Sequence, residues 1–99
     1  MNLGLYIKQL RTAYDKTLHQ VAVGTNIDGT LLSKIERSDR LPTEEQVLKL
    51  AMFFQIPVEV LKIQSIAEKI IKDYGLNEVT LGAIDLVREE LGNYKTSEI

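Results

Sequence analysis

The chain has 99 residues, of which 44% are hydrophobic and 26% charged, with a net charge of −2. This composition is that of one globular domain, or one domain with a short appendage, and it excludes two full domains and a disordered chain. Because no cysteine is present, a disulfide framework, a thiolate zinc site and a thiol nucleophile are excluded, and a reducing cytoplasm fits best. No secretory leader and no apolar run of the ~18 residues that a spanning helix needs is visible, so membrane insertion is not expected.

The first two helices are predicted from apolar spacing and a capping pattern. Apolar residues recur at helical spacing over roughly residues 3–14, which predicts the first helix. Thr17 and Gln20 form a capping-box pattern that predicts a short second helix. That helix is expected to end near Asn26, since asparagine tolerates the left-handed backbone of a helix end.

The next two helices are predicted in the same way. Asp28 is expected to cap a third helix over about residues 29–37. Two helices joined by so short a turn are typical of helix-turn-helix geometry. After a loop, Thr43 and Gln46 form a second capping-box pattern and predict a fourth helix.

Two further helices complete the chain. Pro57 is expected at the start of a fifth helix, where its missing N–H costs nothing, and Gly75 is expected to end that helix after Tyr74. A sixth helix is expected over about residues 77–91, stopped by Gly92. No run alternates with period two between turn residues, so the fold class is predicted to be all-α.

The residue types give no support for catalysis. The one histidine, His19, has no histidine or acidic partner at a metal-binding spacing. Glu44 and Glu45 resemble a carboxylate pair, but they fall in the first turn of the fourth helix, where the helix dipole favours negative charge. No glycine-rich loop follows a strand. The sequence therefore predicts no enzyme, no metal and no cofactor.

A recognisable motif lies in the segment of residues 25–61. It is Leu-Ser-Lys-Ile-Glu-Arg at residues 32–37, followed by Pro42. With this motif, residues 3–62 resemble the Cro and phage-repressor type of helix-turn-helix, the XRE-like family of bacterial transcriptional regulators. The resemblance implies a five-helix, lambda-repressor-like DNA-binding domain over residues 1–62, extended by a C-terminal helix pair over residues 63–99.

In that family the third helix enters the major groove and contacts base edges. The residues that match the base-facing positions are Gly29, Thr30, Ser33 and Lys34. Thr and Ser can donate or accept at base edges and Lys can bond both acceptors of guanine, although a merely solvated helix face is the alternative for Thr30 and Ser33. Gly29 departs from the long polar residue of many members. Either the protein reads fewer bases per half-site, or its helix sits closer to the groove.

The resemblance also implies contacts to the DNA backbone. Leu18 stands where relatives often have a phosphate-binding glutamine, and Thr17, His19 and the free N–H groups of that helix end can replace its contact. Three cations lie in or beside loops that the family lays against DNA: Lys16, Arg37 and Arg40. Arg11 and Glu36 resemble an ion pair that phage repressors form between the first helix and the end of the third, and a structural role is implied for them.

Residues 63–99 lie outside the resemblance and carry more apolar residues than one helix face can bury. We expect this extension to be a dimer interface, with a closed intramolecular helical hairpin as the alternative. The residues expected in the interface are Ile63, Ile66, Ile70, Ile84, Val87 and Leu91.

Together these features predict a sequence-specific transcriptional regulator. The first hypothesis is a dimeric repressor of the restriction-modification controller kind, which binds an inverted-repeat operator in double-stranded DNA. The alternative is an antitoxin that binds a toxin protein through its C-terminal helices and autoregulates its operon. No membrane partner is expected.

Overall fold

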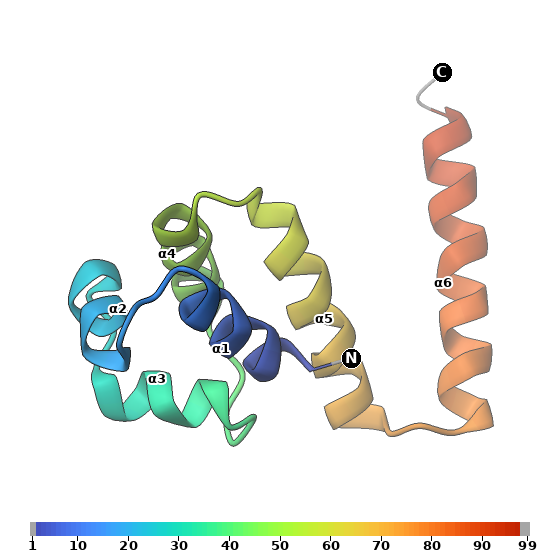
Figure 1. Cartoon of the computed structure of the whole chain (residues 1–99). Helices are drawn as coiled ribbons and strands as arrows, with labels where there is room; N and C mark the ends of the chain where they lie inside the picture. The colour runs from blue at the N-terminus through green and yellow to red at the C-terminus, as the bar shows by residue number, and fades with distance from the viewer. Residues whose placement is uncertain (1, 98–99) are drawn as a thin grey trace. The chain divides into compact units, whose positions relative to one another are not determined.

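A computed structural model describes residues 2–97, with side chains to residue 95, and this part of the chain contains six α-helices and no strand (Figure 1). The predicted all-α fold class is confirmed. The helices are α1 (Leu3–Ala13), α2 (Leu18–Thr25), α3 (Gly29–Glu36), α4 (Glu44–Phe54), α5 (Val58–Tyr74) and α6 (Glu78–Ser97). The chain divides into two compact units, Met1–Lys69 and Ile70–Ile99.

Side-chain caps set the beginnings of α2, α3 and α4. Both predicted capping boxes are present: Gln20 N–H donates to Thr17 Oγ1 at 3.1 Å, and Thr17 N–H donates to Gln20 Oε1 at 2.8 Å. Thr43 and Gln46 repeat the arrangement at the start of α4. Asp28 caps α3 by accepting from Thr30 N–H at 2.9 Å. Each cap satisfies a backbone donor that the helix itself leaves free and is worth about 1 kcal/mol.

The helix ends agree with prediction in two cases and differ in one. Asn26 ends α2 with a left-handed φ of 55°, and Gly75, with φ 86°, follows the end of α5. The prediction that Gly92 stops α6 is wrong, because the helix continues to Ser97. A glycine inside a helix costs about 1 kcal/mol relative to alanine but keeps its backbone hydrogen bond, and no proline follows to break the helix.

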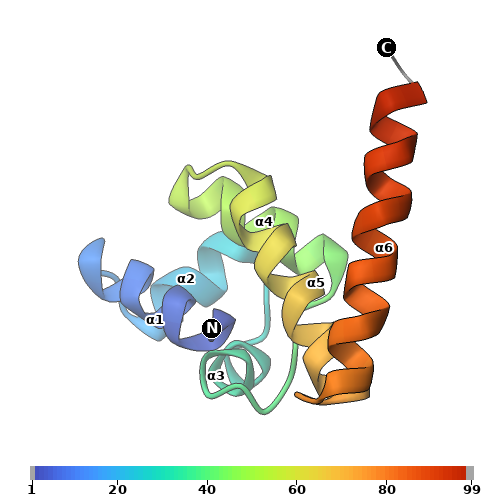
Figure 2. The same cartoon turned by 90° about the vertical axis from the view of Figure 1, so that its right-hand side faces the viewer.

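A single core holds the first unit together. α1 packs on α3, and α2 contacts both α3 and α4 (Figures 1 and 2). By contrast, none of the side chains described from residue 62 to residue 95 is fully buried. The largest fully buried side chains are Leu3, Ile7, Val21, Leu32, Ile35, Leu50, Phe54 and Leu61.

α1 and the end of α3 approach each other without room for a side chain at Gly4. A Cβ there would lie 2.7 Å from the carbonyl oxygen of Glu36 and 2.9 Å from Ser38 Oγ, and would overlap the carbonyl oxygen of Ile35. Ser38 Oγ also donates to Asn2 Oδ1 at 2.8 Å in the same corner. This close backbone contact holds the C-terminal end of α3 against α1.

α5 is tied to the start of α1 by a long-range hydrogen bond. Leu3 N–H donates to Glu68 Oε1 at 2.8 Å. This bond and the buried Leu61 explain why the first unit runs to Lys69, past residue 62. The functional boundary between residues 62 and 63 stays a prediction.

Candidate nucleic-acid interface

The turn between α2 and α3 consists of three residues, Asn26, Ile27 and Asp28. Ile27 is only 4% exposed and belongs to the core, so it fixes the turn from the inside. Asp28 fixes it from the outside, through its hydrogen bond to Thr30 N–H. The angle at which α3 leaves α2 is therefore set by one buried and one capping side chain.

α3 has one buried face and one open face. Leu32 and Ile35 are buried, whereas Thr30 and Lys34 are exposed and Ser33 is partly exposed. In both views α3 lies at the lower edge of the first unit (Figures 1 and 2). The structure thus brings the predicted base-facing side chains together on the open face of a helix whose other face is held by the core.

Arg11 and Glu36 form a two-pronged ion pair between α1 and the end of α3. Arg11 Nε lies 2.8 Å from Glu36 Oε2 and Nη2 lies 3.1 Å from Oε1, while Nη1 donates to the carbonyl of Lys16 at 3.1 Å. The side chains are 18% and 6% exposed. The hydrogen bond to Glu36 raises the pKa of Arg11, burial opposes the rise, and the charge of Glu36 adds to it. The pair anchors α3 to α1, in the structural role that the resemblance implies.

Arg37, predicted to contact phosphate, has two partners within the protein. Its Nε lies 3.2 Å from Asp39 Oδ2, and its Nη1 donates to Ser33 Oγ at 3.3 Å. Both charged side chains are about 60% exposed, 62% and 59% respectively. Sequence reasoning did not identify Asp39, although its position two residues from Arg37 was a visible signal. The carboxylate partly neutralises a cation at the edge of the open face.

The other predicted phosphate contacts lie at the start of α2 and in the loop after α3. Lys16, Thr17 and His19 are exposed beside the first turn of α2, and Arg40 is exposed between α3 and α4. Thr17 Oγ1 accepts the capping hydrogen bond from Gln20 N–H, so its own hydroxyl hydrogen is the group that can donate to a phosphate.

A recess of about 520 Å³ opens between α2 and the start of α3. Ala22 and Ile27, only 9% and 4% exposed, form its floor. No pattern in the sequence predicts this recess, because its lining comes from two helices and the turn between them. The remaining lining residues are His19, Val23, Asn26, Asp28 and Gly29.

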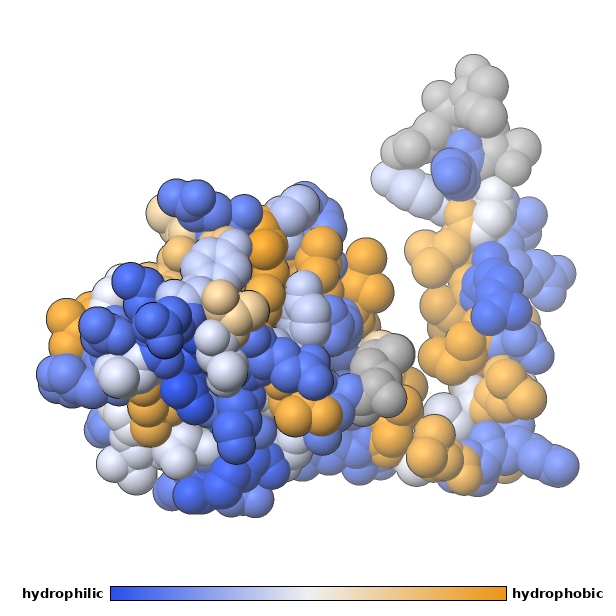
Figure 3. Space-filling view, in the orientation of Figure 1, coloured by the Kyte–Doolittle hydropathy of each residue, from blue (hydrophilic) through white to orange (hydrophobic). Residues whose placement is uncertain are grey.

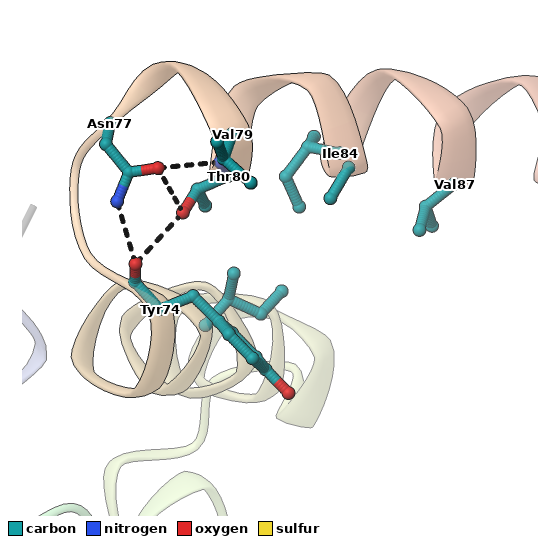
Figure 4. Close-up of a pocket in the computed structure, with 8 residues that line it drawn as sticks. Tyr74, Asn77, Val79, Thr80, Ile84 and Val87 are labelled. Atoms are coloured by element: carbon teal, nitrogen blue, oxygen red, sulfur yellow. Dashed lines mark hydrogen bonds between the residues drawn. The ribbon is translucent and has the colours of Figure 1, made fainter.

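The second unit carries an apolar groove of about 500 Å³ between the end of α5 and α6 (Figure 4). At its closed end, Asn77 Nδ2 and Thr80 Oγ1 both donate to the carbonyl of Tyr74, at 2.9 and 3.1 Å. Ile84 and Val87 point from α6 toward the groove (Figure 4). Polar groups hold the turn, and apolar side chains line the open part.

The residues predicted to form the dimer interface differ in exposure. Ile63, Ile66, Val87 and Leu91 are between 51% and 67% exposed, and hydrophobic residues follow one side of α6 (Figure 3). Ile70 and Ile84 are half-buried and line the groove. On α6 these residues belong to an apolar stripe whose members are four and three residues apart in turn. The stripe begins after Thr80 and consists of Ile84, Val87, Leu91 and Tyr94.

A sequence model of the helix-turn-helix family matches residues 7–61, which is more than half of the chain. The chain belongs to this family. The family is the Cro and phage-repressor type of DNA-binding regulators, and its lambda-repressor-like helical fold is the fold of the first unit. The predicted recognition is thereby confirmed. No curated protein and no solved structure gave a significant match to the chain.

Within residues 2–97 no group of three or more His, Asp or Glu side chains is placed to hold a metal ion. Over the same range no helix is long and apolar enough to cross a membrane.

Proposed function

We propose that the protein is a sequence-specific transcriptional repressor that binds an inverted-repeat operator as a two-fold dimer. The observation that carries the proposal is the open face of α3, where Thr30 and Lys34 are exposed and Ser33 is partly exposed on a helix whose opposite face is buried. Helix-turn-helix proteins insert such a helix into the major groove. We therefore call α3 the recognition helix.

The recognition helix is held rigidly, which favours specific readout. Gly4 allows α1 to touch the end of the helix, the ion pair of Arg11 with Glu36 fixes the same end, and Asp28 caps the start. A side chain carried by a fixed helix loses little freedom when it binds a base. Lys34 can then bond both acceptors of guanine, and the hydroxyls of Thr30 and Ser33 can donate or accept at neighbouring bases.

Cations beside the recognition helix are suited to the phosphate backbone. Lys16 lies next to α2, and Arg37 and Arg40 lie at and after the end of the recognition helix. Such contacts supply much of the affinity of a DNA-binding protein without reading sequence. Repression would follow from occupying DNA that RNA polymerase needs.

The apolar stripe on α6 and the exposed isoleucines of α5 support the dimer. A stable interface takes roughly 800 Å² from each partner. Apolar side chains are exposed along α6 in the second unit and, separately, at Ile63 and Ile66 of α5 in the first unit. Alternating steps of four and three residues are the spacing with which helices pack side by side. A second copy of the chain is therefore the proposed occupant of the apolar stripe on α6.

The regulated genes distinguish two versions of the proposal. A controller of restriction-modification genes is the first, and adjacent methyltransferase and nuclease genes would favour it. The open apolar groove of the second unit could instead accept a helix of a toxin protein, which is the antitoxin version, and an adjacent small toxin gene would favour that.

Selection from a random duplex library, followed by footprinting on the DNA upstream of its own gene, tests the proposal. We expect one enriched sequence with two inverted half-sites, and protection of a matching site upstream. The double variant Ser33→Ala with Lys34→Ala serves as the control, because it should keep its helical circular dichroism spectrum but select no such sequence. If the wild-type protein enriched no particular sequence from the library, the proposed sequence-specific function would be wrong.

A further inference from the structure

The apolar stripe on α6 has the spacing of one strand of a coiled coil. Its members are three, four and three residues apart, as are alternating a and d positions of the heptad repeat. Ile84 and Leu91 correspond to a positions, and Val87 and Tyr94 to d positions. A second helix with the same stripe can therefore pack against it side by side.

Charged side chains of opposite sign border this stripe. Glu90 lies at a g position, one residue before Leu91, and Lys95 lies at an e position, one residue after Tyr94. Both charged side chains are exposed. Residues at e and g of a coiled coil face the partner helix and set its orientation. The charges beside the stripe can therefore decide the direction in which a second α6 lies.

A parallel pair of α6 helices brings these opposite charges together. Each stripe residue then meets its own counterpart, and a g residue faces the e residue five positions further along the partner. Glu90 faces the partner's Lys95 in this arrangement. The two-fold symmetry forms the same pair a second time, so one attractive pair lies on each side of the apolar contact.

An antiparallel pair that matches all four stripe residues loses these attractions. Val87 would then meet the partner's Leu91, and residues at g would face each other. Glu90 would lie against the partner's Glu90, and Lys95 would lie against the partner's Leu81. Because like charges that face each other disfavour association, this arrangement is opposed by the residues beside the stripe.

Sliding an antiparallel partner by one heptad removes the repulsion but spoils the apolar match. Leu91 would then face the partner's Thr80, and Tyr94 would face the partner's Asn77. Asn77 already donates to the carbonyl of Tyr74 at 2.9 Å and precedes the first residue of α6. Only the parallel pair combines a full apolar match with opposite charges on both sides.

The groove of the second unit extends the surface that a partner helix can cover. Ile84 and Val87 line this groove together with Ile70 and Tyr74 from the end of α5 (Figure 4). A helix that packs on the stripe can therefore enter the groove and contact both elements. This adds apolar area to a contact that has only four layers along α6.

We propose that α6 pairs in parallel with α6 of a second copy, and that Glu90 and the partner's Lys95 set this orientation. The proposal rests on the proposed dimer and adds its geometry. In a parallel pair both α6 helices begin at the same end, so both DNA-binding units are joined to that end through residues 70–77. An antiparallel pair would separate the two attachment points by about 30 Å, the length of α6.

Single cysteines in the full-length chain test the orientation, because the natural sequence contains none. Val87→Cys and Leu91→Cys are oxidised separately and as an equal mixture, and the covalent dimer is measured on a non-reducing gel. Glu89→Cys is the matched control, because Glu89 is exposed on the side of α6 opposite the stripe.

We expect each stripe cysteine to form a disulfide with its own counterpart, and Glu89→Cys to form little. Cross-linking in the mixture but not in the separate samples would show an antiparallel pair, and the proposal would be wrong while the dimer stands. A dimer in sedimentation that gives no cross-link at either stripe position would also overturn it. If the wild-type protein sediments as a monomer, the proposed dimer fails, and the orientation fails with it.

A charge exchange tests the role of Glu90 and Lys95. Glu90→Lys should weaken the homodimer about tenfold, because each introduced lysine faces the partner's Lys95. Mixing it with Lys95→Glu should restore dimerisation, since opposite charges then meet on both sides. Glu89→Lys makes the same charge change away from the stripe and should dimerise as the wild type does. Equal weakening by Glu89→Lys, or no recovery in the mixture, would show that Glu90 and Lys95 do not set the orientation.

Discussion

In the proposed complex, Asp39 would compete with a DNA phosphate for Arg37. In the free protein Arg37 Nε lies 3.2 Å from the Asp39 carboxylate, although both side chains are exposed and such a pair is worth at most ~1 kcal/mol. A phosphate bound at Arg37 would therefore displace Asp39, but the carboxylate would remain nearby and repel the DNA. At the residue scale, Asp39 therefore reduces the positive charge that Arg37 contributes to the proposed interface.

Asp39→Asn should consequently strengthen binding to DNA of any sequence. We expect a severalfold gain in affinity and a salt dependence steeper by about one phosphate contact, because Arg37 becomes fully available. Titrations of an unrelated duplex between 50 and 200 mM salt would measure both. Asp85→Asn is the matched control, since Asp85 forms a similar exposed pair with Arg88 at 3.1 Å on α6. An unchanged salt slope would show that Arg37 does not contact phosphate.

Lys34 and Arg37 should respond differently to truncation. Lys34→Ala is expected to lower affinity for the selected site by ~1–3 kcal/mol and to relax the preference at one position per half-site, because it removes a base contact. Arg37→Ala should weaken binding to all sequences alike. Repeating the library selection with each variant separates the two outcomes. An unchanged preferred site with Lys34→Ala would mean that the recognition helix lies in the groove in another register.

The ion pair of Arg11 with Glu36 should contribute strongly to stability, because it is largely buried. Glu36→Ala is expected to cost about 3 kcal/mol in the free energy of unfolding, since it leaves a buried guanidinium unpaired. Because the pKa of Arg11 is raised, the contribution is present below the ordinary arginine pKa and is lost only as the pH rises through the raised value. Between about pH 6 and pH 9 it should therefore be constant.

Urea unfolding of Glu36→Ala, Arg11→Ala and the double variant measures the coupling between the two residues. Glu45→Ala is the control, since Glu45 pairs with Lys49 on the exposed face of α4 at 3.4 Å, and it should cost no more than ~0.5 kcal/mol. If the effects of the two single variants were additive, the ion pair of Arg11 with Glu36 would not contribute to the free energy of unfolding.

At the scale of the helices, helix ends that neighbouring residues determine could be predicted from the sequence. Contacts between residues far apart in the chain could not. The capping boxes at Thr17 and Thr43 act within one turn, so the sequence predicts them correctly. The end of α6 was predicted wrongly because one glycine only weakens a helix. The hydrogen bond between Glu68 and Leu3 joins residues 65 positions apart, and no local sequence pattern predicts it.

Glu68 should stabilise the first unit from outside the segment that matches the family. Glu68→Ala is expected to cost about 1–2 kcal/mol in urea unfolding, because a backbone N–H at the start of α1 loses a carboxylate partner. Glu90→Ala, on the exposed part of α6, is the control and should change little. If Glu68→Ala were as stable as Glu90→Ala, the hydrogen bond from Leu3 to Glu68 would not stabilise the packing of α1 on α5. A truncation that keeps residues 1–75 retains this contact, whereas one after residue 62 loses it.

The candidate site followed from the sequence only in part, for a related reason. The open face of α3 is a matter of helical period, so Thr30, Ser33 and Lys34 could be placed on it. The recess, in contrast, is lined by Ala22 from α2, Ile27 from the turn and Gly29 from α3, which only the packing of the two helices brings together. The partial neutralisation of Arg37 depends on the path of the loop to Asp39. Both arise from packing between segments.

For the whole molecule, the proposed dimer sets the geometry of the operator. Two recognition helices reach one face of the duplex only when their centres are ~34 Å apart, so half-sites should be centred about 10 base pairs apart, or a further whole turn. Val87→Asp with Leu91→Asp should give a monomer in sedimentation and weaken operator binding greatly, because each half-site is then bound independently.

Gly82→Asp is the control for that experiment, because it adds an aspartate to α6 at a position outside the apolar stripe. It should remain a dimer. A wild-type protein that sediments as a monomer at micromolar concentration and binds a single half-site tightly would contradict both the dimer and the inverted repeat.

The exposure of the side chains described in α6 also affects how quickly the protein would be degraded. No side chain described in this helix is fully buried, and two of its residues, Gly82 and Gly92, each lower helix stability by about 1 kcal/mol. A helix with so little support opens readily when it has no partner. In the proposed dimer, dilution would therefore release a chain whose α6 unfolds first and is open to proteases. Degradation would then fall on unpaired copies, and the amount of repressor would be held near the concentration at which it dimerises.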